Sequence, residues 1–249
     1  MSETILNLLP LHPGEAEEFE AIAPGAAHIY ARRSSVTREQ LAAATVLLGW
    51  PKGEDLRQAV RLKWFQTMWA GTEEYDGFLP QGALFTSSSG SNSRSVAEHM
   101  LTGLMAVCRH LPSYLDSQRS HVWKDEGPMK TILGGTVLVA GAGNVGSAFG
   151  RLCQGLGART IGLKRTVSGP IEGFDEVRSM DELDTLLPQA DVVALALPHS
   201  SQTAGLINAE RIARMKDDAI LISAGRGSVL DQDALARQAV GRRLGRHRP

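Results

Sequence analysis

The sequence is poor in cysteine, in aromatic residues and in long apolar runs. Only two of its 249 residues are cysteine, and 5% are aromatic. Cys108 and Cys153 lie in apolar helical patterns, where a cysteine usually acts as a small buried hydrophobe, and no metal-site spacing links them. These features exclude a disulfide framework and a thiolate metal centre, and they favour a reducing, cytoplasmic compartment.

Charge and hydropathy exclude further classes of protein. The formal net charge is −1, which provides no electrostatic reason to expect nucleic acid or an anionic membrane as the main partner. The N-terminus lacks a basic flank followed by a long apolar core, and no apolar run approaches the roughly 20 residues that span a membrane. We therefore expect a soluble protein that is not exported.

The apolar content, 43% of the chain, is sufficient for the cores of one large or two medium domains. We predict a smaller α/β domain over residues 1–94, in which apolar strand-length segments alternate with helical ones. The expected strands are Ile5–Leu9, Ala27–Tyr30, Thr45–Leu48 and Lys63–Gln66, and the expected helices are near Glu15–Ala23, Arg38–Ala44 and Leu56–Val60.

A polar loop, Ser87–Ser93, follows this domain and leads to a second one over residues 95–249. This second domain is predicted to begin with a long helix, because apolar residues recur at helical spacing. They are Val96, Met100, Leu104, Val107 and Leu111.

The most informative segment is Thr136–Gly146, where a short apolar run ends in glycines at the point where a strand would lead into a helix. Gly141 permits a tight turn, Gly143 lets the backbone approach a pyrophosphate, and Gly146 lets the helix pack close to the strand. The free N–H groups at the helix start, around Asn144 and Val145, would face the phosphates. The alternative is a glycine-rich turn without a ligand.

The context of the glycines argues against that alternative. A strand at Val137–Val139, a helix over Ser147–Leu156 and a second strand at Thr160–Leu163 give β-α-β in the required length. Ala190–Leu197 and Ala219–Ile222 are nearly all apolar, as strands buried on both faces of a parallel sheet must be. The prediction is an α/β protein with a doubly wound Rossmann domain and a smaller, flavodoxin-like α/β domain.

Three ordered motifs now resemble those of the D-isomer-specific 2-hydroxyacid dehydrogenases, which include glyoxylate/hydroxypyruvate reductases and phosphoglycerate dehydrogenase. They are Asn92–His99, the run Ala190–Pro198 with Thr203 and Gly205–Asn208 after it, and Met215–Asp231, in which Ser223 stands where asparagine is usual. The resemblance implies hydride transfer between a nicotinamide cofactor and a small 2-oxo or 2-hydroxy acid. By the same resemblance, a homodimer formed through the long helix is expected.

For the substrate, the resemblance implies that Arg226 holds the carboxylate and the oxo group, a role that suits the planar, permanently charged guanidinium. The alternative for Arg226 is a surface arginine at a strand end. Backbone N–H groups of Ala70, Gly71 and Thr72 would bind the same carboxylate, although Gly71 could be an ordinary turn glycine.

For the cofactor, NAD-binding relatives carry an acid at the end of the second strand, and here that place falls on Lys164. Lys164, Arg165 and Thr166 could surround a 2′-phosphate, which favours NADP over NAD, unless the two basic residues simply lie in solvent. The resemblance also places Pro198, Thr203, Ala224 and Arg226 at positions that lie near the nicotinamide half of the cofactor in the family. His199 lies beside them and is expected to pack or to touch phosphate.

None of the residues named so far is suited to act as the general acid. The family uses a histidine oriented by a glutamate, and both lie well after the Arg-Gly motif. Neither the helical neighbours Glu98 and His99 nor His247 in the basic tail is a suitable replacement. The abrupt change to Arg246–Pro249 suggests a frameshift or sequencing error that truncates the chain. Three interpretations stay open: a dehydrogenase, a dinucleotide-binding pseudoenzyme without turnover, and a regulatory dinucleotide sensor.

Overall fold

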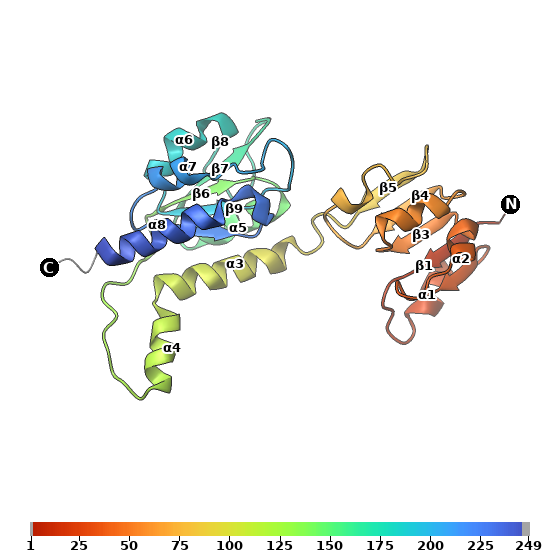
Figure 1. Cartoon of the computed structure of the whole chain (residues 1–249), viewed down its shortest axis with the longest axis horizontal. Helices are drawn as coiled ribbons and strands as arrows, with labels where there is room; N and C mark the ends of the chain where they lie inside the picture. Colours follow the sequence, from red (N-terminus) through yellow and green to blue (C-terminus); the bar gives the residue numbers. More distant parts are fainter. Residues whose placement is uncertain (1, 246–249) are drawn as a thin grey trace. The chain divides into compact units, whose positions relative to one another are not determined.

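The computed structural model describes residues 2–245, and side chains up to residue 238. The chain divides into two compact units between Ser91 and Asn92, whereas the sequence analysis placed this boundary after Arg94. Each unit contains a five-stranded sheet, and all neighbouring strands are parallel (Figure 1). Both units therefore have the α/β architecture that the sequence predicted.

The sheet of the first unit has the strand order β2-β1-β3-β4-β5. Its core lies around Leu6, Leu47 and Phe65, all fully buried, and Phe65 packs edge-on against Tyr75 with ring centroids 4.8 Å apart. The strands are β1 Thr4–Asn7, β2 Ala27–Tyr30, β3 Val46–Gly49, β4 Trp64–Thr67 and β5 Leu84–Ser87, and the helices are α1 Glu15–Ile22, α2 Arg38–Ala43, η1 Gly53–Gln58 and η2 Glu73–Tyr75.

Two details of this unit differ from the prediction. The expected helix at Leu56–Val60 is a 3₁₀-helix that begins at Gly53 and ends at Gln58, and Val60 lies beyond it, 72% exposed. Strand β5 was not predicted, because it lies at the sheet edge and its four residues are at most partly buried. An edge strand lacks the continuous apolar signal of a central one.

The sheet of the second unit has the strand order β10-β9-β6-β7-β8. Its strands are β6 Thr136–Ala140, β7 Arg159–Lys164, β8 Glu176–Ser179, β9 Val192–Leu195 and β10 Ile220–Ser223. Its helices are α3 Ser93–Cys108, α4 Leu111–Arg119, α5 Asn144–Gly155, η3 Met180–Glu182, α6 Leu183–Leu186, η4 Leu187–Gln189, α7 Ala209–Arg214, η5 Gly227–Val229 and α8 Gln232–Gly245.

Helices cover both faces of this sheet (Figure 1), and each face carries an apolar core. On one face, α3 and α5 contribute Leu104 and Phe149. On the other face, α6 and α7 contribute Leu183 and Ile212. The doubly wound arrangement follows from these two layers. Within residues 2–245, none of the helices combines the length and apolar character needed to cross a bilayer.

The predicted long helix is divided into two. Helix α3 ends at Cys108, and Leu111, the last member of the apolar series, begins α4. His110 between them adopts a left-handed conformation with φ of 52°. Pro112 explains the break, because a proline in the interior of a helix removes a backbone hydrogen bond and clashes with the preceding turn, whereas the first turn tolerates it.

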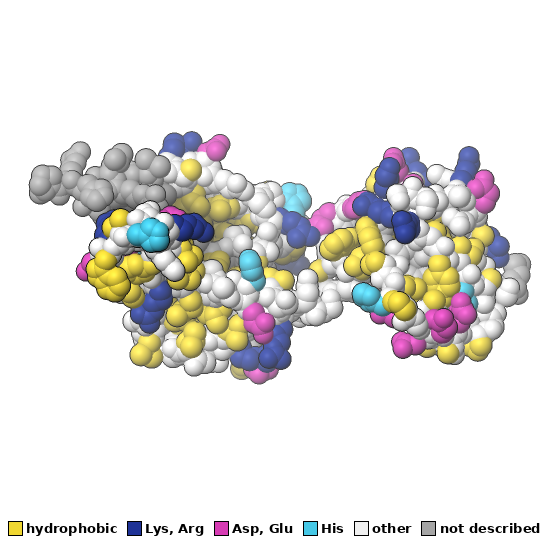
Figure 2. Space-filling model, turned by 90° about the horizontal axis from the view of Figure 1, so that it is seen from below, with side chains coloured by type: hydrophobic (Ala, Val, Ile, Leu, Met, Phe, Trp, Pro, Cys, Tyr) yellow, Lys and Arg dark blue, Asp and Glu magenta, His cyan; other side chains and the backbone are white. Residues whose placement is uncertain are grey.

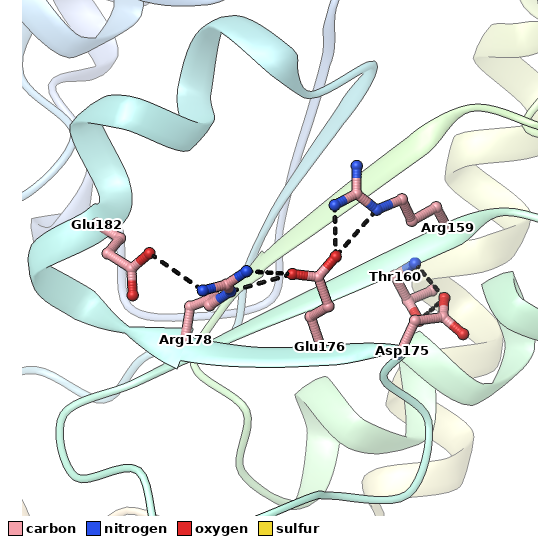
Figure 3. Close-up of polar contacts among 6 residues, drawn as sticks. All are labelled: Arg159, Thr160, Asp175, Glu176, Arg178 and Glu182. Carbon is pink, nitrogen blue, oxygen red and sulfur yellow. Dashed lines mark hydrogen bonds and ion pairs between the residues drawn. The ribbon is translucent and has the colours of Figure 1, made fainter.

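Charged side chains hold the outer strand β8 to its neighbour (Figure 3). Glu176 accepts hydrogen bonds from Arg159 on β7 and from Arg178 on β8. Beside it, the Asp175 carboxylate accepts from the backbone N–H of Thr160 at 2.7 Å. Because these charges stand where apolar residues would mark a strand, β8 was not predicted from the sequence.

Candidate functional site

The glycine loop lies between β6 and α5, and two of its glycines are required by close contacts. Gly141 has φ of 105°, and a Cβ there would lie 2.5 Å from the carbonyl oxygen of Ala196. A Cβ on Gly146 would lie 2.0 Å from the carbonyl oxygen of Gly141. Neither distance is possible for a real side chain, so these two residues perform the steric roles that the sequence predicted for them.

Gly143 differs, because a Cβ there would meet nothing within 4 Å. The position opens to solvent directly before α5, whose first residues are Asn144 and Val145. No side chain caps this helix, and its first turn carries no acidic residue. The exposed N–H groups and the positive end of the helix dipole therefore suit an anion such as a pyrophosphate.

The end of β7 lies beside this loop. The backbone N–H groups of Gly141 and Ala142 both donate to the carbonyl oxygen of Leu163, at 3.1 Å and 2.9 Å. Lys164 is half-buried, and Arg165 and Thr166 are exposed. The structure thus brings the predicted 2′-phosphate residues next to the glycine loop, and two of the three carry a positive charge.

Arg165 also contacts the loop that follows β9. Its Nη1 donates to Oε1 of Gln202 at 3.3 Å. Gln202 could not be predicted from the sequence, because it belongs to no motif and lies 37 positions from Arg165. The sheet order alone brings the two loops together.

The loop after β9 is stabilised by its own polar side chains. The Thr203 hydroxyl donates to the carbonyl oxygen of Pro198 at 2.7 Å and accepts from the backbone N–H of Ser200 at 2.9 Å. His199 Nδ1 shares a hydrogen bond with Ser228 Oγ at 2.8 Å, which connects this loop to η5. Thr203 thereby stabilises the loop, and His199 is held by Ser228, which lies within the third motif but received no predicted role.

Arg226 follows β10 at the same edge of the sheet. The backbone N–H of Ala224 donates to the carbonyl oxygen of Leu195 at 2.9 Å, and a Cβ on Gly225 would lie 2.7 Å from the carbonyl oxygen of Leu197. Gly225 therefore lets this turn pack against the loop after β9, and it leaves the Arg226 side chain exposed. Ala224 also lines a hollow of about 420 Å³ between α3 and β10.

All predicted site residues of the second unit lie at the carboxyl ends of its strands. The chain runs from β6 through β7 to β8 on one side, and it then continues through β9 to β10 on the other side. The glycine loop follows β6, the strand at which the direction changes. Ligands of open parallel sheets bind outside the carboxyl ends at this topological switch point.

Ala70, Gly71 and Thr72 belong to the first unit. They follow β4 at the carboxyl edge of its sheet, and the Thr72 carbonyl oxygen accepts a hydrogen bond from the backbone N–H of Tyr75 at 2.9 Å. Ala70 is exposed, and the other two are partly buried. The turn is therefore accessible to a small ligand.

The remaining titratable candidates among the described residues lie on helices and not at the carboxyl ends of the strands. Glu98 and His99 are exposed on α3; Glu98 pairs with Arg94 at 3.2 Å, whereas His99 lines the same hollow as Ala224. Burial raises the pKa of Cys153 to about 12, so this thiol stays protonated and acts as a buried hydrophobe. His247 lies outside the described residues.

Comparison with known proteins identifies the family. The family described as "D-isomer specific 2-hydroxyacid dehydrogenase, NAD binding domain" matches residues 101–246, which include the glycine loop and Arg226. This chain belongs to that family. The dehydrogenase motifs of the sequence analysis are thus confirmed at the level of the family.

Individual relatives agree. D-3-phosphoglycerate dehydrogenase of Mycobacterium tuberculosis (strain ATCC 25618 / H37Rv) is 34% identical over 169 residues, which are 68% of this chain and 32% of that enzyme. The chain thus spans about a third of this curated relative's length. The D-lactate dehydrogenase of Treponema pallidum (strain Nichols) is 30% identical over 185 residues, 73% of this chain and 55% of that protein.

A solved structure shows the same fold over nearly the whole chain. The D-isomer specific 2-hydroxyacid dehydrogenase family protein of Aeromonas salmonicida subsp. salmonicida A449 aligns with a TM-score of 0.84 at 25% identity. The alignment covers 96% of this chain and 78% of the other. The arrangement of strands and helices in this chain is therefore that of the family.

Proposed function

We propose that this chain binds NADP through the glycine loop and serves in hydride transfer between NADP(H) and a small 2-oxo or 2-hydroxy acid. The observation that carries the proposal is the open backbone at Gly143 beside two basic side chains, Lys164 and Arg165. The loop suits the pyrophosphate, and the basic pair suits a further phosphate. Family membership supports the dinucleotide, and the basic pair supports the choice of NADP.

The choice between NADP and NAD depends on the end of β7. An acid at this place would accept hydrogen bonds from both ribose hydroxyls, but an ammonium and a guanidinium cannot accept a hydrogen bond. Both can donate to a 2′-phosphate, and Gln202 holds Arg165 beside the glycine loop. The residues present therefore fit NADP better than NAD.

The substrate would be bound by Arg226 and by the turn of Ala70, Gly71 and Thr72. A guanidinium pairs with a carboxylate through two parallel hydrogen bonds, and it stays charged at any working pH. When bound, NADPH supplies the hydride that reduces the oxo carbon. The part of Arg226 is to orient the substrate and to stabilise the negative charge that develops on the oxo oxygen.

The cofactor is tested by isothermal titration calorimetry on the 249-residue chain. Replacing Lys164 and Arg165 together with alanine is expected to weaken NADPH binding at least tenfold and to leave NADH binding nearly unchanged. Each charge-assisted contact contributes about 1.5–3 kcal/mol, so the loss of two easily exceeds a factor of ten.

The matched control removes two exposed charges elsewhere on the second unit, at Arg119 and Lys124. This control changes the net charge equally, and it is expected to leave the affinity for both cofactors unchanged. Equal losses for NADPH and NADH in the Lys164/Arg165 variant would show that the pair does not bind the 2′-phosphate.

Turnover is tested separately, by the decrease of NADPH absorbance with glyoxylate or hydroxypyruvate. Binding of NADPH without oxidation would identify a dinucleotide-binding protein without turnover. Where oxidation occurs, Arg226→Lys is expected to lower kcat/KM, because an ammonium cannot reproduce the two-pronged contact with the carboxylate.

We also propose that the chain forms a homodimer through α4 and the loop that follows it. Exposed apolar side chains gather here, on the side of the second unit that Figure 2 displays. Trp123 is fully exposed, a costly state for the largest side chain. A second copy that covers this segment would remove the apolar surface from water. The exposed apolar residues are Leu111, Leu115, Val122, Trp123 and Met129.

A further inference from the structure

A large hollow lies in the first unit, at the carboxyl edge of its sheet. Its volume is about 990 Å³, and it is lined by residues that follow β1, β2 and β3, among them Leu11, Arg32 and Trp50. Pockets for small molecules usually enclose about 300–1,000 Å³. Strand β1 lies between β2 and β3, so the chain direction changes at β1 and the hollow occupies the topological switch point of this sheet, where ligands bind.

The lining is mainly apolar, and its charges nearly cancel. More than half of the lining residues are leucine, proline, alanine, tyrosine or tryptophan. Arg33 pairs with Glu74 at 3.1 Å, and Arg32 and Glu17 add one exposed charge of each sign to the lining. The hollow therefore suits an apolar group better than a multiply charged one.

One buried polar group within the lining points to a ligand. Asn7 ends β1 and is only 2% exposed. Its Oδ1 accepts from the backbone N–H of Leu9 at 2.9 Å, but its buried Nδ2 has no hydrogen-bond acceptor among the described residues. A buried donor without an acceptor is costly, so a ligand oxygen that accepts from this N–H would bind favourably.

Two contacts connect the hollow to the turn of Ala70–Thr72. The Trp50 ring in the wall packs edge-on against Trp69, with centroids 6.2 Å apart, and Trp69 directly precedes the turn. The ion pair of Arg33 with Glu74 joins the wall to η2, which directly follows the turn. A molecule held at the turn by its carboxylate thus has an apolar hollow beside it.

We infer that this hollow receives the side chain of the substrate, so that the substrate is a 2-oxo acid with a large apolar side chain and a hydrogen-bond acceptor at its far end. The inference rests on the proposed function, which assigns the substrate carboxylate to the Ala70–Thr72 turn. It narrows the substrate class, because glyoxylate and hydroxypyruvate have nothing that reaches the hollow.

The test is calorimetric titration of the full chain, saturated with the oxidised cofactor NADP⁺ so that no reduction occurs, with pyruvate, phenylpyruvate and 4-hydroxyphenylpyruvate. Each buried methylene contributes about fourfold in affinity, so phenylpyruvate is expected to bind at least tenfold more tightly than pyruvate. The hydroxyl oxygen of 4-hydroxyphenylpyruvate provides an acceptor for Asn7, and this compound is expected to bind more tightly still.

Two variants at Leu11 change the hollow in different ways. Leu11→Asp puts a charge into the apolar wall, and Leu11→Trp fills the space with an apolar ring. Both variants are expected to lower the affinity for phenylpyruvate to about the affinity for pyruvate. The control is Leu84→Asp, because Leu84 is 60% exposed and begins β5, at the amino edge of the same sheet. Thermal unfolding of each variant verifies that it is folded.

The outcomes separate the inference from the proposed function. Equal affinities for pyruvate and phenylpyruvate, or a preference that survives both Leu11 variants, would overturn the inference, while pyruvate binding would still support the proposed function. Binding of NADPH with no binding of any 2-oxo acid would overturn the proposed substrate class, and the inference with it. Weaker binding of the hydroxylated compound would refute the role of Asn7.

Discussion

The glycines of the dinucleotide loop allow steric and ligand-binding roles to be separated by single methyl groups. In Gly146→Ala the new Cβ would lie 2.0 Å from the Gly141 carbonyl oxygen and 3.1 Å from Cγ1 of Val139. The first of these atoms belongs to the backbone, so it cannot rotate away. Helix α5 must therefore move away from β6, which opens the core on that face of the sheet.

The size of the effect follows from two opposing terms. Overpacking of a well-packed core costs about 1–3 kcal/mol, and a clash with backbone belongs at the upper end. Alanine is favoured over glycine inside a helix by about 1 kcal/mol, which offsets part of the cost. We expect Gly146→Ala to lower the free energy of unfolding by about 2 kcal/mol, or roughly 4–8 °C in Tm for a chain of this size. The affinity for NADPH should also fall, because the start of α5, which is proposed to bind the pyrophosphate, is displaced.

Gly143→Ala is the matched change, because its Cβ meets nothing within 4 Å. The free energy of unfolding should change by less than about 0.5 kcal/mol, as for other surface substitutions. The methyl group would nevertheless stand on the open surface where the backbone is expected to approach the pyrophosphate, so NADPH affinity should fall at least tenfold. Gly146→Ala is thus expected to lose mainly stability, and Gly143→Ala is expected to lose mainly affinity for NADPH.

Thermal unfolding and calorimetric NADPH titration measure both quantities on the same samples. Gly155→Ala is the control, since Gly155 ends α5 with no atom near the added Cβ. It should gain up to about 1 kcal/mol in stability and bind NADPH normally. A Gly146→Ala protein as stable as the parent would refute the steric argument, and normal NADPH binding by Gly143→Ala would refute the assignment of the loop to the pyrophosphate.

Two further predictions concern assembly and pH. Trp123→Ser should shift the sedimentation coefficient from that of a dimer toward that of a monomer, whereas Ile22→Ser, at another exposed apolar residue, should not; a monomeric parent chain would contradict the proposed dimer. Burial raises the pKa of Asp191, but this is outweighed by Lys216 at 2.7 Å and the Thr136 N–H, so its net pKa is lowered. The resulting stability is full above the unfolded-state pKa of about 3.9 and is lost as the pH falls through the folded-state value. Urea unfolding between pH 7 and pH 3 should therefore show a smaller acid loss in Lys216→Gln, and identical pH profiles would contradict this.

The central strands of both sheets could be predicted because they are buried on both faces. The buried β9, for example, lies within the predicted Ala190–Leu197. Strand β2 is a partly exposed edge strand, and it was nevertheless predicted with its observed bounds, Ala27–Tyr30. The strands that were missed, β5 and β8, are both sheet edges. In β8, Glu176 is held to the neighbouring strand by Arg159, a pairing between distant residues that no local pattern reveals.

The same distinction applies to the candidate site. A motif identifies positions at which the backbone geometry permits one residue type. Gly141 and Gly146 are examples, because any side chain there would collide with the backbone. A motif does not identify residues that act by holding another residue, because their partners are set by the sheet order. Gln202, which accepts from Arg165, is of this second kind, and so is Ser228, whose contact with His199 could not be predicted although Ser228 lies within the third motif.

A residue that holds another side chain in place determines how much an exposed charge can contribute to ligand binding. An exposed ion pair is usually worth little, because water screens it and ordering a long side chain costs entropy. Arg165 is exposed, so its value for a 2′-phosphate depends on being held before the ligand arrives. The hydrogen bond that Arg165 donates to Gln202 provides that constraint, and Gln202 belongs to the loop after β9, whereas Arg165 follows β7. The proposed preference for NADP is therefore a property of two loops together, and Lys164 and Arg165 alone would not be sufficient for it.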